Sequence, residues 1–196
     1  MYAQSTLTVL LAAAAGLASA LPATAATRAT RTPKDLPART VPLTGVTHTV
    51  VAGLGGALVF DPNNVVAEVG DIVEWHYLPK NHSVAQSSFG SPCQPLADAN
   101  GNAVGFFSGF QPTAEGQAPD VFQIVVENTN PTWYYCAQTV GNHCQKGMAG
   151  VINQNFDSAN TLAAYEAAAA LTGVSGVPPV VQGGAVIANP NPLGGF

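Results

Sequence analysis

Charged residues are scarce in this chain. Lysine, arginine, aspartate and glutamate together make up 9% of its 196 residues. A low charged fraction is typical of folded domains, whereas disordered chains usually carry more charge. Beyond residue 41 the only cations are Lys80 and Lys146, which stand against ten acidic residues and give a net charge of −8 with neutral histidines. Such an acidic surface repels phosphate backbones, so we expect no nucleic-acid partner.

Long apolar runs are also missing, except at the N-terminus. The run from Leu7 to Leu17 is followed by the small residues Ala18-Ser19-Ala20, a pattern that fits signal-peptidase cleavage after Ala20. A membrane helix is the alternative, but the run is too short to span a bilayer comfortably. We therefore assign residues 1–20 to a signal peptide and expect a secreted, extracellular protein without a transmembrane span.

Residues 21–45 lack any apolar period and are rich in alanine, threonine, proline and arginine, which predicts a flexible leader. Residues 46–155 instead contain short β-like runs separated by turn residues. The predicted strands are 47–52, 58–60, 65–69, 72–77, 82–87, 121–127, 132–136 and 148–153. Short strands at this spacing predict an all-β domain, an antiparallel Greek-key β-sandwich of two packed sheets.

The pattern changes again after the predicted sandwich. Residues 156–173 contain an alanine-rich stretch that follows good N-cap residues and stops at Gly173, so a short helix is expected there. Residues 174–196 contain glycine, proline, valine and asparagine without a period. This composition predicts a disordered tail.

Methionine and histidine are rare, and one of each lies in a short stretch that begins with a cysteine. Cys136, His143 and Met148 follow one another over a short stretch, and Met148 is the only methionine besides the initiator. A thiolate, an imidazole and a weak axial thioether suit copper, which needs a second imidazole from elsewhere. His82 is the leading candidate for that imidazole. His48 and His76 lie within strand patterns and are more simply surface or core-edge residues.

The three cysteines are an odd number for a protein in an oxidising compartment. One disulfide plus one thiolate held by a metal would explain the count. Cys93 lies in a loop without other candidate ligands, so we pair it with Cys144 and leave Cys136 for the metal. An intermolecular bridge, an unused buried thiol, or a bridge between Cys136 and Cys144 are the alternatives.

Other chemistries find little support in the sequence. Zinc also uses cysteine and histidine, but a structural zinc site favours paired, closely spaced cysteines and has no use for Met148. The Gly-x-Ser-x-Gly and His-Glu-x-x-His motifs of hydrolases are absent. Four histidines are too few for the additional copper centres of a multicopper oxidase. We therefore expect a copper-binding protein rather than an enzyme.

The pattern Cys-x6-His-Cys-x3-Met, preceded by Asn81-His82-Ser83-Val84, resembles the cupredoxin (blue copper) family. The similarity covers roughly residues 45–155. It is closest to the phytocyanin/plastocyanin-like branch and to fungal secreted cupredoxin-like proteins, some of them extracellular serine-rich proteins. The resemblance implies one type 1 copper ion held by a ligand set of four residues, namely His82, Cys136, His143 and Met148.

In phytocyanins the cysteine beside the second ligand histidine is bonded to an earlier loop cysteine. Carried over, this again implies a disulfide between Cys93 and Cys144. The interval from Cys136 to His143 is two residues longer than is usual in phytocyanins, so the ligand loop is expected to differ in geometry.

These expectations lead to a secreted type 1 copper protein for electron transfer or extracellular copper handling. The alternative from another class is a cell-surface or wall-associated structural module that keeps the fold without redox activity. Copper storage or delivery without electron transfer is a third hypothesis. We expect a monomer with an unidentified redox or copper-exchange partner, and association with the cell wall is compatible with the sequence.

Two sequence signals bear on processing. Asn81-His82-Ser83 is an N-glycosylation sequon, so Asn81 is a candidate glycan site; a fold that keeps the loop from the transferase is the alternative. The last residues lack the hydrophobic tail that a lipid-anchor signal needs, so we expect a free secreted protein.

Overall fold

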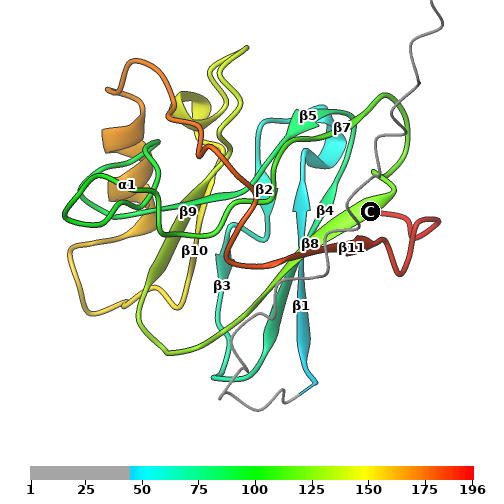
Figure 1. Ribbon diagram of the computed structural model, residues 1–196, viewed down its shortest axis with the longest axis horizontal. Helices are drawn as coiled ribbons and strands as arrows, with labels where there is room; N and C mark the ends of the chain where they lie inside the picture. Colours follow the sequence, from blue (N-terminus) through cyan, green and yellow to red (C-terminus); the bar gives the residue numbers. More distant parts are fainter. Residues whose placement is uncertain (1–44) are drawn as a thin grey trace, which may run out of the picture. The chain divides into compact units, whose positions relative to one another are not determined.

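Two packed β-sheets form the framework of residues 45–196, the part of the chain that this computed structural model describes (Figure 1). One sheet has five strands in the spatial order β11-β8-β4-β1-β2, and the other has four in the order β3-β10-β9-β6. A small third sheet pairs β5 with β7. The predicted signal peptide at 1–20 and, apart from its last residue, the predicted leader at 21–45 lie outside the described residues.

The strands of the five-stranded sheet are β1 Thr47–Ala52, β2 Phe60–Asp61, β4 Ile72–Tyr77, β8 Asp120–Val125 and β11 Ala185–Ala188. The four-stranded sheet contains β3 Asn64–Val65, β6 Ala85–Ser87, β9 Thr132–Tyr135 and β10 Ala149–Ile152. The other elements are β5 Lys80–His82, β7 Gln111–Thr113, the 3-10 turns η1 Leu54–Gly56 and η2 Cys144–Lys146, and the helix α1 Leu162–Ala169.

Most strand pairs are antiparallel, but β1 runs parallel to β4 and β3 runs parallel to β10. The predicted all-β class with one helix is confirmed, with the correction that both large sheets are mixed. The chain between β1 and β4 crosses to the other sheet at β3 and returns, which allows β4 to pair with β1 in the parallel direction. Such long-range pairing leaves no signature in a local sequence window.

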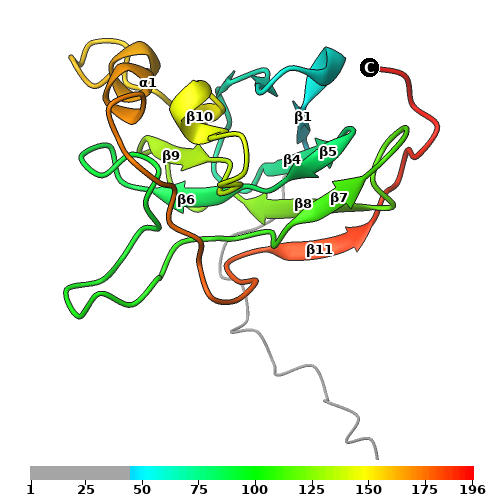
Figure 2. The same ribbon diagram turned by 90° about the horizontal axis from the view of Figure 1, so that it is seen from above.

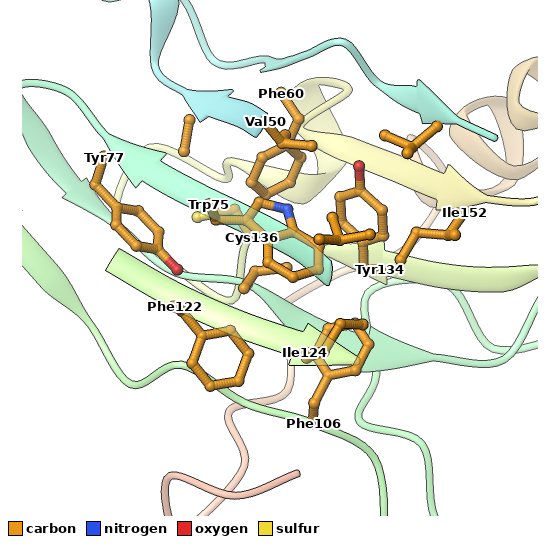
Figure 3. Close-up of a cluster of buried hydrophobic side chains, with 14 of the residues drawn as sticks. Val50, Phe60, Trp75, Tyr77, Phe106, Phe122, Ile124, Tyr134, Cys136 and Ile152 are labelled. Carbon is orange, nitrogen blue, oxygen red and sulfur yellow. The ribbon is translucent and has the colours of Figure 1, made fainter. Parts of the chain in front are cut away.

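The interface between the two sheets is the main hydrophobic core (Figure 3). Alternate residues of β4 point inward, and the Trp75 ring meets the Tyr134 ring from the facing sheet edge-on at a centroid distance of 5.3 Å. Phe122 of β8 lies 6.1 Å from the same indole. Each large apolar side chain buried in this way contributes roughly 1.5–3 kcal/mol to folding. Cys136 belongs to this cluster, so its thiol lies at the edge of a rigid core.

The helix α1 lies beside β9 and β10, on the side away from the five-stranded sheet (Figure 2). Its first turn is capped by Thr161, whose hydroxyl accepts a hydrogen bond from the Ala164 amide at 3.2 Å. Tyr165 stacks on Trp133 at 5.4 Å and hydrogen-bonds Ser87 at 2.6 Å. The predicted helix is thus present. No helix within residues 45–196 has both the length and the apolar character needed to cross a bilayer.

Two local predictions need correction. Residues 174–196 were expected to be disordered, yet Ala185–Ala188 forms β11 and pairs with the outer edge of β8. The run Ala-Val-Ile-Ala is apolar enough to take that edge, and pairing satisfies backbone groups that would otherwise face solvent. The single strand predicted at 82–87 is in fact two, because the chain turns between β5 and β6, which join different sheets.

Candidate metal centre

Three of the four predicted ligand residues converge on one point. One side-chain donor atom from each of His82, Cys136 and His143 lies within 4.8 Å of the other two. All three side chains are buried: His82 and Cys136 are 0% exposed and His143 is 5% exposed. Within residues 45–196 this is the group of histidine, cysteine and acidic side chains that could hold a metal.

The ligand loop is held closed by backbone hydrogen bonds between the predicted ligands themselves. The Cys136 amide donates to the Met148 carbonyl at 3.0 Å, and the Met148 amide donates to the His143 carbonyl at 3.0 Å. Gly147 has a φ of 93°, a left-handed conformation that lets the chain leave η2 directly into β10. The loop geometry therefore follows from the pairing of β9 with β10.

The Cys136 thiol is free, and the amide and hydroxyl of Ser83 lie near its sulfur. The Ser83 amide lies 3.4 Å from Sγ and the Ser83 hydroxyl lies 3.9 Å from it, while that hydroxyl accepts a hydrogen bond from the Ala137 amide at 3.0 Å. Burial raises the pKa of the Cys136 thiol, and the hydrogen bonds from the backbone and from Ser83 oppose this increase. A metal ion would supply the charge that the buried thiolate otherwise lacks.

The two imidazoles are neutral at ordinary pH, so their ring nitrogens can bind a metal ion. Burial, and next the nearby His143, lower the pKa of His82 to about 4. Burial also lowers the pKa of His143, with smaller contributions from Lys80 and Lys146. The His143 Nδ1 atom lies 3.4 Å from Cys136 Sγ.

Both ring nitrogens of His82 are buried without a hydrogen-bond partner among the described residues. Leaving a buried polar atom unsatisfied costs about 1–3 kcal/mol, so a bound ion would remove a real penalty. The Nε2 edge of the ring faces Gly53, where an added Cβ would come within 2.6 Å. The residues present therefore fit a metal ion, with an unpaired imidazole nitrogen and a buried thiol at the same point.

Met148 is fully buried and belongs to the same hydrophobic cluster as Cys136. Its backbone bonds place it next to the other candidate ligands. Its role as an axial ligand stays a prediction.

The disulfide between Cys93 and Cys144 is present, with an S–S distance of 2.06 Å. It leaves Cys136 as the free cysteine, which is the distribution that the odd count suggested. Both bonded cysteines are fully buried. Because Cys144 directly follows His143, the bond anchors the ligand loop to the loop that carries Cys93.

The remaining histidines lie outside the metal group. The Nε2 atom of His48 lies 2.8 Å from Asp71, and the Nε2 atom of His76 lies 2.6 Å from Glu74. Glycosylation at Asn81 stays a prediction. Asn81 is half-buried in β5 with its Oδ1 atom buried, and Ser83 of the sequon is fully buried, so the folded chain offers little access.

Two residues beside the ligands were missed from sequence. Ser83 directly follows His82, so its closeness to Cys136 could have been suspected once the two ligands were assumed to meet. Gly53 gives no such signal, since glycine is common in turns and its approach to His82 depends on how the turn after β1 folds against β5.

Sequence comparisons place this chain among known proteins, although no family model matches it. Over 149 residues it is 37% identical to a protein named "Probable GPI-anchored cupredoxin-1" from Arthroderma benhamiae, covering 74% of this chain and 73% of that protein. The chain belongs to the cupredoxin family. The family resemblance predicted from the ligand motif is thereby confirmed.

A second relative of this cupredoxin is an "Extracellular serine-rich protein" from the same organism, 35% identical over 135 residues. The match covers 69% of the chain but only 49% of the relative, so the chain spans about half of that protein's length.

Solved structures similar to this cupredoxin include native pseudoazurin from Hyphomicrobium denitrificans, at 21% identity and a TM-score of 0.35, which matches over 55% of this chain and 73% of that one. Auracyanin A from Chloroflexus aurantiacus is 13% identical with a TM-score of 0.39, over 55% of this chain and 96% of that one. The family membership rests on the sequence relative.

Proposed function

We propose that this cupredoxin binds one copper ion in a type 1 site through His82, Cys136 and His143, with Met148 as a weak axial ligand. The observation that carries the proposal is the convergence of one thiol and two imidazoles within 4.8 Å in a buried position. Two imidazoles and one thiolate in a trigonal set are the donors of blue-copper electron-transfer sites.

Copper accounts for this donor set better than zinc. A structural zinc site is closed by four cysteine or histidine ligands, and only three such donors meet here among the described residues. A catalytic zinc site keeps an open position for water, whereas these three side chains are at most 5% exposed. A soft, long thioether contact from Met148 would complete a copper site and would add little to a zinc site.

The chain's own residues perform the tasks that a type 1 site requires. His82 and His143 offer neutral nitrogen donors, and Ser83 directs its amide and hydroxyl at the thiolate sulfur. The disulfide and the β9–β10 pairing hold the loop in place before metal arrives. A bound copper ion supplies a one-electron change of oxidation state, and a ligand set fixed in advance keeps the rearrangement small.

We further propose that the protein acts outside the cell, in electron transfer or in copper handling. The printed names of its relatives, one GPI-anchored and one extracellular, support a location at the cell surface or in the medium. The predicted signal peptide at 1–20 supports the same location. The whole protein's partner is not identified by these relatives.

Copper titration of the purified protein tests the proposal. The protein should take up one equivalent of Cu(II) and develop an intense visible thiolate-to-copper band. Cys136→Ser should abolish the band, whereas His48→Asn should leave it unchanged because His48 lies outside the metal group and contacts Asp71 instead.

A colourless protein that ignores copper would contradict the metal proposal and would favour a structural module. A coloured protein that does not exchange electrons with small redox reagents would instead favour copper storage or delivery. Denatured, metal-free protein should contain one thiol that reacts with a chromogenic disulfide, because the other two cysteines are bonded to each other.

A further inference from the structure

The only two cations of residues 45–196 lie on either side of the metal centre. Lys80 is the first residue of β5, two positions before His82, and Lys146 is the last residue of η2, three positions after His143. Both lysines are exposed. The ten acidic residues of the same segment make the protein as a whole strongly negative. The positive charge of the domain is therefore confined to the rim of one site, and we call these two residues the lysine collar.

Backbone contacts hold the collar in place. The Lys80 ammonium donates a hydrogen bond to the Gly56 carbonyl at 2.7 Å, which places it over η1. The Lys146 amide donates to the His143 carbonyl at 3.2 Å, which fixes the start of its side chain beside that ligand.

Neither collar lysine forms an ion pair with a carboxylate among residues 45–196. The ion pairs among the described residues are those of His48 and His76, and neither involves a lysine. Asp61 and Glu166 line the same surface hollow as Lys146 but form no ion pair with it. The charges that act on the His143 ring are those of the two lysines, which add to the effect of burial in lowering its pKa.

Exposed glycines lie near the collar and beside the His143 ring. Gly55, Gly56 and Gly141 are exposed, and a Cβ added at Gly55 or Gly56 would meet no atom within 4 Å. His143 is 5% exposed. A Cβ added at Gly141 would lie 3.5 Å from His143 Cδ2, so a small molecule that meets the exposed backbone at Gly141 comes close to the ring.

The charge distribution favours a small anion over an acidic protein. A protein partner usually covers about 800 Å² of each surface, and over such an area it would also meet the negative remainder of this domain. A small anion seated at the collar lies within about one Debye length, roughly 10 Å at 0.1 M salt, of only the local charges.

We propose that the lysine collar is the docking site for a small redox-active anion that exchanges one electron with the copper centre at the His143 edge. This inference rests on the proposed electron-transfer function. The exchange is outer-sphere: the anion gains or loses one electron, the copper ion loses or gains the same electron, and no bond forms or breaks.

The sign of the change in electron-transfer rate with salt distinguishes attraction by the collar from repulsion by the net charge. The reduced, copper-loaded full-length protein is oxidised in a stopped-flow instrument with hexacyanoferrate(III), a trivalent anion, and with tris(phenanthroline)cobalt(III), a trivalent cation. Ionic strength is varied from about 0.01 M to about 0.5 M, which shortens the Debye length from about 30 Å to only a few Å. If the net charge dominates, the anion reacts faster as salt rises. The collar predicts that it reacts more slowly as salt rises.

Charge variants localise the effect. Lys80→Gln combined with Lys146→Gln removes two positive charges at the collar and keeps polar side chains of similar length. Asn128→Asp combined with Asn130→Asp lowers the net charge by the same two units. These two exposed residues precede the N-terminal end of β9, which is the end away from Cys136. With each ammonium on the order of 10 Å from the anion at 0.1 M salt, the collar variant should react with hexacyanoferrate(III) about fivefold more slowly than the parent protein. The control variant should change the rate by less than about twofold.

An anion rate that rises with salt, or equal rates in the two variants, would overturn the proposal. The visible band and the copper content of the same samples distinguish this failure from failure of the metal proposal. A missing band would refute the copper site. A normal band with no preference of the reaction for the anion would refute only the collar. If polyglutamate blocks the hexacyanoferrate(III) reaction while free glutamate at equal charge does not, the collar belongs to an acidic polypeptide and the small-anion assignment is wrong.

Discussion

A single methyl group at Gly53 should weaken the metal centre, because this glycine lies against a predicted ligand. The residue has a φ of 91°, and a Cβ built on its backbone would lie 2.6 Å from Nε2 and 3.0 Å from Cδ2 of His82. Ordinary contacts begin near 3.4 Å, so Gly53→Ala requires the imidazole to retreat by about 0.8 Å, the difference between these two distances. Functional sites tolerate displacements of only about 0.5 Å.

Gly55 provides a matched control in the same turn. It also has a positive φ, 61°, but a Cβ there would meet nothing within 4 Å. Alanine in a left-handed conformation costs about 1–2 kcal/mol at either position, so both variants should lose similar folding stability from the backbone. Only Gly53→Ala should also disturb the ligand, and changes around metal ligands typically lower affinity by about 10- to 100-fold.

The assay is copper binding in competition with a chelator of known affinity, together with the visible spectrum and urea unfolding of the metal-free proteins. We expect Gly53→Ala to lose at least about tenfold in copper affinity and to change its visible band, with Gly55→Ala close to the parent protein. Equal affinities and spectra for the two variants would refute the view that Gly53 positions the His82 ring.

Two further predictions concern the metal-free protein. The disulfide closes a loop with a sequence separation of 51, so replacing Cys93 and Cys144 by alanine should lower the free energy of unfolding by about 4 kcal/mol in urea; a loss below about 1 kcal/mol would contradict this estimate. Stability should also fall as the pH decreases from 6.5 towards 4, because the unfolded His82 binds a proton near 6.5 and the folded one only near 4. The loss should be no more than about 3 kcal/mol, and a pH dependence that persists unchanged in His82→Asn would assign it to other groups.

Much of the fold was predictable because local patterns decide it. The alternation of apolar and polar residues from Ile72 to Tyr77 predicted β4, although the polar face, with Glu74 and His76, is buried as well. The helix α1 follows from an alanine-rich run behind a capping threonine. The order of the strands was not predictable, since the parallel pairing of β1 with β4 joins segments that are about twenty-five residues apart. The strand β11 was missed because its pairing partner, β8, lies far from it in sequence.

The sequence by itself determined which donor atoms this cupredoxin can offer to a metal, and that Cys136, His143 and Met148 share one loop. These features are covalent and local, so no folding argument is needed to read them. The sequence named His82 as the leading second imidazole, but the tertiary structure decided that it meets Cys136 and His143. It also decided that Ser83 and Gly53 lie against the ligands and that the Lys80 ammonium reaches the Gly56 carbonyl. Each of these contacts joins distant segments, and the packing of the two sheets and the closing of the loop between β9 and β10 bring those segments together.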